Sequence, residues 1–307
     1  MEITDALISY RRYLKRRNFS AHTIKNYMNR LKHFIVWVDV PLEQVDYEKV
    51  LLYVEWLLGK RLTATTINAH LFCISGFYQY LHYEKGLTIA NPVKKRSTLR
   101  VPKPLPRFVK DEELNLFFKA VKTLRDRAMF MLMLRCGLRV EEVAHLKLPA
   151  IDLKRRSLMI IQGKGGKSRV VYLSQDAYDA LVVYLKVRKP NKTHGLFLVE
   201  KGSCKGHPLS VRGIQKRMEY YARKAGVSIS CHQLRHTMAT QMLNADAQLE
   251  TIQDLLGHSG IITTQRYCKV SNMKVKRDYY KAMEIVMTRT APVQTAKKRL
   301  DIHKNMQ

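Results

Sequence analysis

Residues 232–240 read His232-Gln233-Leu234-Arg235-His236-Thr237-Met238-Ala239-Thr240. His232 and Arg235 are three residues apart, so a helix places both on one face. We expect that helix to begin close to Gln233, with an imidazole and a guanidinium together at its start. His232 and His236 also have the four-residue spacing of helical zinc ligands, but the glutamate that a metalloprotease places between them is absent.

Two further polar residues follow downstream. The run Leu255-Leu256-Gly257-His258 has the form of a helix end, and Tyr267 comes nine residues after His258. Taken alone, His258 is an ordinary residue after a helix and Tyr267 an ordinary packing residue. Their position after the 232–240 run is what makes them candidates for chemistry.

Two clusters lie upstream. A helix is expected to end near Gly137 and another to start beyond it, which puts Arg139 at a turn close to a helix N-terminus, where anions are favoured. The apolar runs 158–161 and 170–173 flank a glycine-rich segment, 162–167, and predict a β-hairpin. Its turn presents Lys164 and Lys167.

These residue types match the needs of metal-free cleavage of a phosphodiester. Guanidinium groups bind the charged nonbridging oxygens of the transition state, a nucleophile attacks in line, and an acid protonates the leaving oxygen. Each cluster by itself also fits an ion pair, a solvated turn or a core contact. The four clusters in this order favour phosphoryl chemistry.

The first hundred residues are expected to be helical. Ser20, Asp46 and Thr63 are in position to cap helices with regular apolar faces, and Ile3 to Tyr13 is expected to form a further helix. A proline-rich basic segment at 91–107 is interpreted as an exposed linker between two domains. A plain helical bundle fits the periodicity of the N-terminal part equally well.

The excess of basic residues indicates which kind of partner the protein binds. Lys and Arg total 55 against 25 Asp and Glu, a formal net charge of +30, so an anionic partner is expected. No apolar run is long enough to span a membrane, and no secretory signal is evident. The five cysteines are scattered, which favours reduced thiols in a cytoplasmic protein.

Together the motifs resemble the tyrosine recombinase (integrase) family, most closely its compact Xer-like and transposon-encoded members. The resemblance is carried by Gly137-Leu138-Arg139, by 232–240, by 255–259 and by Thr263-Thr264-Gln265-Arg266-Tyr267. It implies a mainly α fold: a helical SAM-like N-terminal domain and a mixed α/β catalytic domain with a small antiparallel sheet, forming a C-shaped clamp on DNA. The expected limits are 1–90 for the DNA-binding domain, 91–107 for the linker, 108–288 for the catalytic domain and 289–307 for a basic tail.

The resemblance also assigns roles. Arg139 and Arg235 hold the scissile phosphate, and His258 donates a third hydrogen bond to it. His232 assists proton movement at the nucleophile, and Lys164, rather than Lys167, protonates the leaving 5′ oxygen. Tyr267 attacks and forms a 3′-phosphotyrosyl ester, and strand exchange proceeds through a Holliday junction. No metal and no cofactor are expected. Cys268-Lys269 replaces the family's commoner Thr-His after the tyrosine.

The same resemblance implies double-stranded DNA as partner, a homo-tetramer in the synaptic complex, and room for accessory DNA-binding proteins. It implies a prokaryotic or mobile-element protein of the cytoplasm, associated with the nucleoid and with no membrane partner. A helix up to Met287, interrupted later by Pro292, is expected to dock onto a neighbouring protomer. Two alternatives stay open: a type IB topoisomerase-like nicking-closing enzyme, and a DNA-binding regulator that never cuts.

Overall fold

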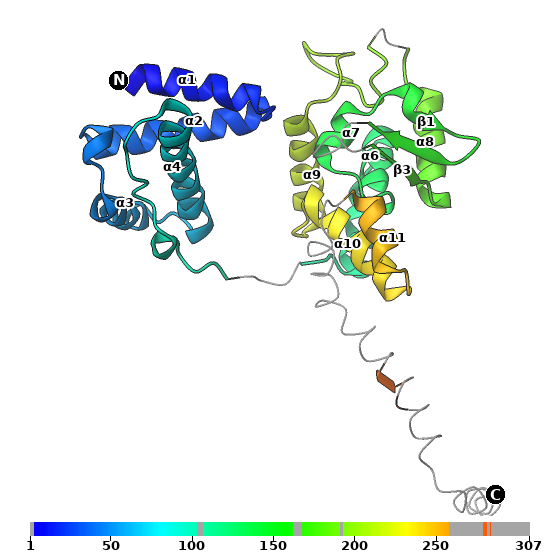
Figure 1. Cartoon of the computed structure of the whole chain (residues 1–307). Helices are drawn as coiled ribbons and strands as arrows, with labels where there is room; N and C mark the ends of the chain where they lie inside the picture. Colours follow the sequence, from blue (N-terminus) through cyan, green and yellow to red (C-terminus); the bar gives the residue numbers. More distant parts are fainter. Residues whose placement is uncertain are drawn as a thin grey trace, which may run out of the picture. The chain divides into compact units, whose positions relative to one another are not determined.

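The chain divides into two units, Met1–Lys103 and Pro104–Gln307, and each contains its own hydrophobic core. The structure, a computed structural model, describes residues 3–102, 107–161, 168–190, 193–257, 279, 280 and 283. Figure 1 shows both units coloured along the sequence.

Three helices of the first unit begin at the capping side chains that the sequence predicts. Ser20, Asp46 and Thr63 each accept a hydrogen bond from the main-chain N–H three residues further on. Gly86 ends the last of these helices in the left-handed conformation, with φ of 65°. The α-helices are α1 (Ile3–Arg16), α2 (Ala21–Val38), α3 (Tyr47–Gly59) and α4 (Ala64–Lys85).

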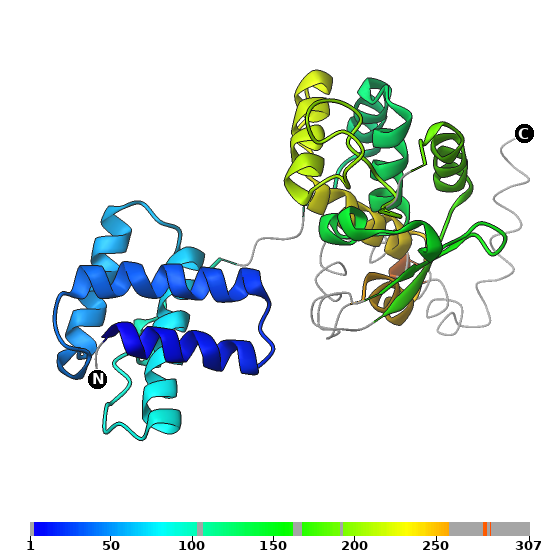
Figure 2. The same ribbon diagram turned by 90° about the horizontal axis from the view of Figure 1, so that it is seen from above.

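Helix α4 packs against the other three helices of the first unit. Figure 2 shows α1 and α2 running side by side in opposite directions, joined by a short turn. The core contains polar aromatic groups that find partners inside it: the Tyr53 hydroxyl lies 2.9 Å from His70 Nδ1, and the Tyr78 hydroxyl donates to the Leu42 carbonyl at 3.0 Å. Burial of the imidazole lowers the pKa of His70 to about 4, so this histidine is neutral at physiological pH.

The segment that follows α4 is held on the first unit. Asn68 exchanges two hydrogen bonds with the main chain of Leu99, both at 2.8 Å, and Ser97 is buried. Residues 91–99 therefore pack on α4 and its neighbours before the chain continues to the second unit. The domain limits expected at residues 90, 107 and 288 stay predictions.

The second unit is built around a buried central helix, α6 (Leu124–Arg135). Met129, Phe130 and Leu132 are fully buried, which is the pattern of a helix surrounded on several sides. Helices α8 (Gln175–Val187) and α10 (Cys231–Asn244) both pack against α6. Further α-helices of this unit, within the described residues, are α5 (Asp111–Ala120), α7 (Val140–His145), α9 (Val211–Ala225) and α11 (Leu249–Leu256).

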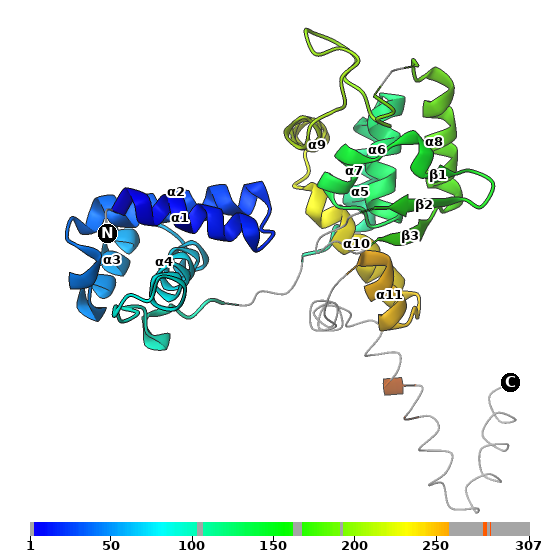
Figure 3. The same ribbon diagram turned by 45° about the horizontal axis from the view of Figure 1, so that its top comes forward.

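A small antiparallel sheet lies beside these helices. Its strands, in spatial order, are β1 (Ile151–Asp152), β2 (Ser157–Ile160) and β3 (Arg169–Tyr172). Leu158 pairs with Val171 and both are fully buried, whereas Met159 and Val170 pair on the exposed face. The predicted hairpin is confirmed, although its turn at 162–167 lies outside the described residues. Figure 3 shows α11 beside β3, close to α10.

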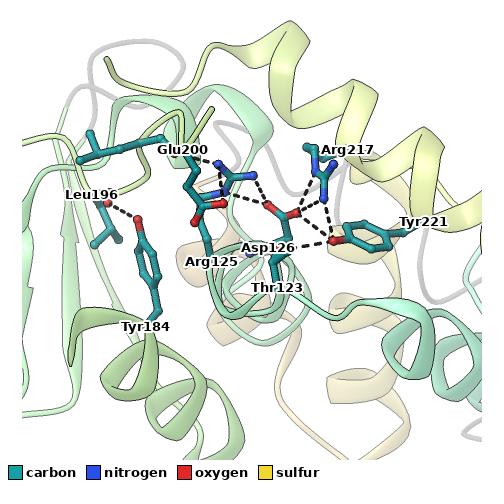
Figure 4. A network of polar contacts seen from close by, with 9 residues as sticks. Thr123, Arg125, Asp126, Tyr184, Leu196, Glu200, Arg217 and Tyr221 are labelled. Atoms are coloured by element: carbon teal, nitrogen blue, oxygen red, sulfur yellow. Dashed lines mark hydrogen bonds and ion pairs between the residues drawn. The ribbon is translucent and has the colours of Figure 1, made fainter. Parts of the chain in front are cut away.

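A buried carboxylate ties α6 to α9 (Figure 4). Asp126 is fully buried and forms ion pairs of 2.7 Å with both Arg125 and Arg217. It also accepts a hydrogen bond of 3.1 Å from the Tyr221 hydroxyl. Burial alone would raise the pKa of Asp126, but Arg125, together with the other partners, lowers it, so the carboxylate is charged at neutral pH.

The fold class that the sequence predicts is confirmed: a helical N-terminal unit, and a second unit of helices with a small antiparallel sheet. Within the described residues, no helix combines the length and the apolar character that a bilayer span requires.

Candidate active site

Arg139 occupies the turn between α6 and α7, as predicted, where it is the N-cap of α7. Its main-chain N–H and its Nη1 each donate to Glu142, both at 2.8 Å, and its Nη2 donates to the Gly257 carbonyl at 3.3 Å. The side chain keeps 19% of its surface exposed. Gly137 makes the turn possible because its φ of +62° is unfavourable for other residues.

Arg235 is almost completely buried, with 2% of its surface exposed. Its Nη1 donates to the Gly137 carbonyl and its Nη2 donates to the Leu256 carbonyl at 2.5 Å. A Cβ atom added to Gly137 would lie 2.9 Å from the Leu256 side chain, so these two segments are in close contact. The structure therefore brings the two predicted phosphate-binding arginines to the same helix end, although they are far apart in the sequence.

His232 lies in the first turn of α10, on the same helix as Arg235, and is exposed. The helix begins with a capping box: Ser230 Oγ accepts from the Gln233 N–H at 3.3 Å, and the Gln233 side chain accepts from the Ser230 N–H at 2.8 Å. The His232 ring stands edge-on to the His236 ring, with centroids 4.2 Å apart. Among the described residues, no group of three or more His, Cys, Asp or Glu side chains is arranged to hold a metal ion.

The C-terminal end of α11 is the point where the site converges. Arg169 Nε donates to the Leu255 carbonyl at 2.7 Å, Arg235 to that of Leu256, and Arg139 to that of Gly257. The last carbonyls of a helix have no partner within it and carry partial negative charge, so cations bind there favourably. Three guanidinium groups from three separate segments thus meet at one helix end.

Glu142 neutralises part of this charge. Its two oxygens also accept hydrogen bonds from Arg169 Nη1 and Nη2, both at 2.8 Å, so one carboxylate is shared by Arg139 and Arg169. Burial raises the pKa of Glu142, but the hydrogen bonds from Arg169 and Arg139 outweigh it and bring the pKa to about 2. The carboxylate is therefore charged at every physiological pH.

Sequence reasoning missed Arg169 and Glu142. One signal was available for each of them. Strand alternation puts Arg169 on the same side as the buried Val171, and a buried arginine requires an anionic partner. Glu142 stands three residues after Arg139, the spacing of both a capping box and a helical ion pair.

Two cysteines stand next to site residues in the sequence: Cys136 precedes Gly137, and Cys231 precedes His232. Burial raises the pKa of both the Cys136 and the Cys231 thiol to about 12. A thiol with so high a pKa stays protonated at neutral pH and is a poor nucleophile. Neither of them therefore competes with a hydroxyl nucleophile.

The remaining predicted site residues, Lys164, His258 and Tyr267, lie outside the described residues. Of the six predicted residues, the structure places Arg139, His232 and Arg235. Gly257, the last described residue before His258, is itself a partner of Arg139.

Comparison with known proteins agrees with this fold. Residues 107–274 match the phage integrase family, and residues 7–85 match the phage integrase N-terminal SAM-like domain. The tyrosine recombinase XerC of Staphylococcus haemolyticus is 34% identical over 278 residues, which cover 87% of this chain and 92% of that protein.

Solved structures are similar over most of the chain. The Tn1549 transposon integrase bound to circular intermediate DNA has 18% identity and a TM-score of 0.70 over 85% of this chain and 94% of that one. A lambda integrase dimer on a COC′ core site has 20% identity and a TM-score of 0.71 over 87% of this chain and 95% of that one. These two likenesses concern the fold, whereas the family matches and the XerC similarity define the class: the chain belongs to the phage integrase family and is a tyrosine site-specific recombinase.

Proposed function

We propose that this recombinase cuts and rejoins double-stranded DNA through a covalent bond between Tyr267 and a phosphate at its recombination site. The observation that carries the proposal is the convergence of Arg139 and Arg235 on the final carbonyls of α11, directly before His258 in the sequence. A net charge of +30 suits a polyanionic partner. The Tn1549 and lambda integrase structures both contain DNA.

Arg139 and Arg235 are proposed to bind the nonbridging oxygens of the scissile phosphate. A guanidinium matches the geometry of two phosphate oxygens and stays charged throughout the reaction. Arg139 combines a fixed main chain with a partly exposed side chain, so it is placed to contact DNA with little reorganisation. His258 is proposed to donate the third hydrogen bond.

In the proposed first step, the Tyr267 oxygen bonds to phosphorus as the bond from phosphorus to the 5′ oxygen breaks. His232 assists removal of the phenolic proton, and Lys164 gives a proton to the departing 5′ oxygen. In the second step, a 5′ hydroxyl of the partner strand attacks the phosphotyrosyl ester and releases the tyrosine. One phosphate ester replaces another in each step, so no nucleotide cofactor supplies energy.

Strand exchange between two duplexes requires several protomers. We extend the proposal to a tetramer, with exchange through a Holliday junction and the segment after Tyr267 joining neighbouring protomers. The sequence of this segment has apolar residues at helical spacing up to Met287. Two of its residues, Tyr279 and Tyr280, are helical and exposed.

Trapping on a nicked suicide substrate tests the proposal. The full chain is expected to form a denaturant-resistant protein–DNA adduct, whereas the Tyr267→Phe variant is expected to bind the same DNA and form none. An adduct in the Phe variant would remove Tyr267 from its role. No adduct with the unaltered chain on any site-bearing substrate would favour a non-cleaving DNA-binding protein.

A second assay separates recombination from simple nicking and closing. On two substrates of different length, a recombinase yields strands joined across substrates, whereas a topoisomerase-like enzyme only relaxes supercoils.

Cleavage in excess chelator is expected to continue, because the proposed groups that neutralise the phosphate are cationic side chains. Loss of cleavage with recovery on added magnesium would contradict this step.

A further inference from the structure

Three side-chain nitrogens of Arg169 donate hydrogen bonds to groups that lie outside the hairpin. Its Nη1 and Nη2 bind both oxygens of Glu142 and its Nε binds the Leu255 carbonyl. The side chain is 8% exposed, and that of Glu142 is 7% exposed. Burying this ion pair has a desolvation cost, which its three well-formed hydrogen bonds offset only while the geometry is kept.

The orientation of Arg139 depends on this pair. Glu142 Oε1 accepts from Nη1 of both arginines, and Oε2 accepts from the Arg139 main chain and from Arg169 Nη2. Without Arg169, the carboxylate would keep only Arg139 among these partners and would be free to rotate toward it. The position of the proposed phosphate-binding guanidinium is therefore set partly by a residue on β3.

Arg169 also holds the base of the hairpin. It pairs with Ile160 as the last pair of β2 and β3 next to the turn, so its main chain anchors one end of the segment that carries Lys164. Its side chain meanwhile contacts the C-terminal end of α11. A Cβ atom added to Gly257 would lie 3.1 Å from Arg169 Cδ, so the two segments touch directly before His258.

We propose that Arg169 is a positioning residue of the recombination reaction. It holds the base of the Lys164 hairpin, the Arg139–Glu142 pair and the end of α11 in fixed positions relative to one another. Arg169 does not contact the phosphate in this proposal; it acts through Glu142 and the Leu255 carbonyl. The inference rests on the proposed function of Tyr267 and its partners.

The test measures single-turnover formation of the covalent adduct at saturating DNA, with full-length protein. Arg169→Gln is expected to lower the rate constant about 100-fold, the scale of a small misplacement of catalytic groups, with the affinity for DNA nearly unchanged. Arg169→Lys keeps the charge but has a single nitrogen in place of the three nitrogens with which Arg169 reaches Glu142 and Leu255, so we expect an intermediate rate. A merely structural role would instead lower the amount of active protein at an unchanged rate constant.

A double-variant cycle tests the route through Glu142. Arg169→Gln combined with Glu142→Gln is expected to be no slower than the slower single variant, within about twofold, because both changes break the same coupling. Effects that multiply would show that Arg169 acts independently of Glu142 and would overturn the inference.

Arg125 offers a matched control. It is also buried, and it forms ion pairs with Asp126 at 2.7 Å and with the more exposed Glu200 at 3.5 Å (Figure 4). Like Arg169, it also donates to one main-chain carbonyl, that of Leu198. Arg125→Gln is expected to lower thermal stability and leave the rate constant within about twofold of the unaltered chain, as expected for an independent site. An equal rate loss in Arg125→Gln and Arg169→Gln, or an unchanged rate in Arg169→Gln, refutes the positioning role.

The unaltered chain and Tyr267→Phe are run alongside. If the unaltered chain forms no adduct, the proposed function fails. If it forms an adduct that Tyr267→Phe lacks, and Arg169→Gln matches the unaltered rate, only the positioning role fails. Circular dichroism of each variant establishes its fold, and Arg169→Lys and Glu142→Gln test the coupling if Arg169→Gln does not fold.

Discussion

Replacing Glu142 with glutamine is expected to destabilise the second unit by about 3 kcal/mol at neutral pH. The magnitude follows from the carboxylate: its pKa falls from the ordinary 4.5 to about 2 in the folded chain, and each pKa unit corresponds to about 1.4 kcal/mol. The side chain is 7% exposed, so solvent screens the interaction little. Glutamine keeps the shape and the capping hydrogen bond but removes the charge that two guanidinium groups share.

The pH dependence makes this prediction specific. Because the folded pKa lies below the unfolded one, the stabilisation is complete above pH 4.5 and is lost as the pH falls to about 2. Urea unfolding of the chain and of Glu142→Gln, followed from neutral pH downward, should show the two stabilities converging across that window. A difference that stays constant with pH, or that is absent at neutral pH, would refute the reasoning.

Glu113→Gln is a suitable control for the capping geometry. Glu113 occupies the same position on α5 and accepts from the Lys110 N–H at 3.3 Å. Glutamine preserves such a cap, so we expect a change of no more than about 0.5 kcal/mol.

Three further predictions concern separate features. Gly137→Ala is expected to cost about 1–3 kcal/mol in urea unfolding, because alanine is strained at φ +62° and its Cβ would lie 2.9 Å from Leu256; a cost below about 0.5 kcal/mol would contradict the close packing. Lys164→Ala should regain cleavage on a 5′-bridging phosphorothiolate, whose sulfur leaves without a proton, and rescue of Lys167→Ala instead would assign the acid to Lys167. Affinity for DNA should fall steeply with salt, by about 0.9 in log–log slope per phosphate contact, and a flat dependence would mean that the charge of +30 serves another purpose.

Local signals predicted the beginnings of the helices well. Ser20, Asp46 and Thr63 cap their helices through bonds that span three residues, so the sequence around each position contains all the necessary information. Arg139 and Arg235 were found because a family pattern marks them, although their meeting at α11 depends on tertiary structure.

Apart from the local Arg139–Glu142 contact, the missed features depend on contacts between distant residues. The Arg169–Glu142 pair joins positions 27 residues apart, and the Asn68–Leu99 pair joins positions 31 residues apart. Asn68 is not unusual in its own sequence window, where it resembles a residue on the exposed face of a helix. For Arg169, strand alternation indicates the buried face but does not identify Glu142 as the partner. Burial, which the sequence does not state directly, makes these pairs specific.

Three arginine side chains bind the end of α11 through its main-chain carbonyls, and this affects how this part of the chain can vary. Arg139, Arg169 and Arg235 donate to three main-chain carbonyls, and these hydrogen bonds do not involve the side chains of the residues that carry the carbonyls. Leu255, which is only partly buried, can therefore be exchanged for other apolar residues as long as the helix ends at the same place, whereas the fully buried Leu256 is also constrained by its contact with Gly137. Insertion or deletion of one residue within α11 would rotate the helix end by about 100° and shift it by about 1.5 Å, removing all three partners together. Helix length, more than the identity of its residues, is then the property that selection has to preserve here.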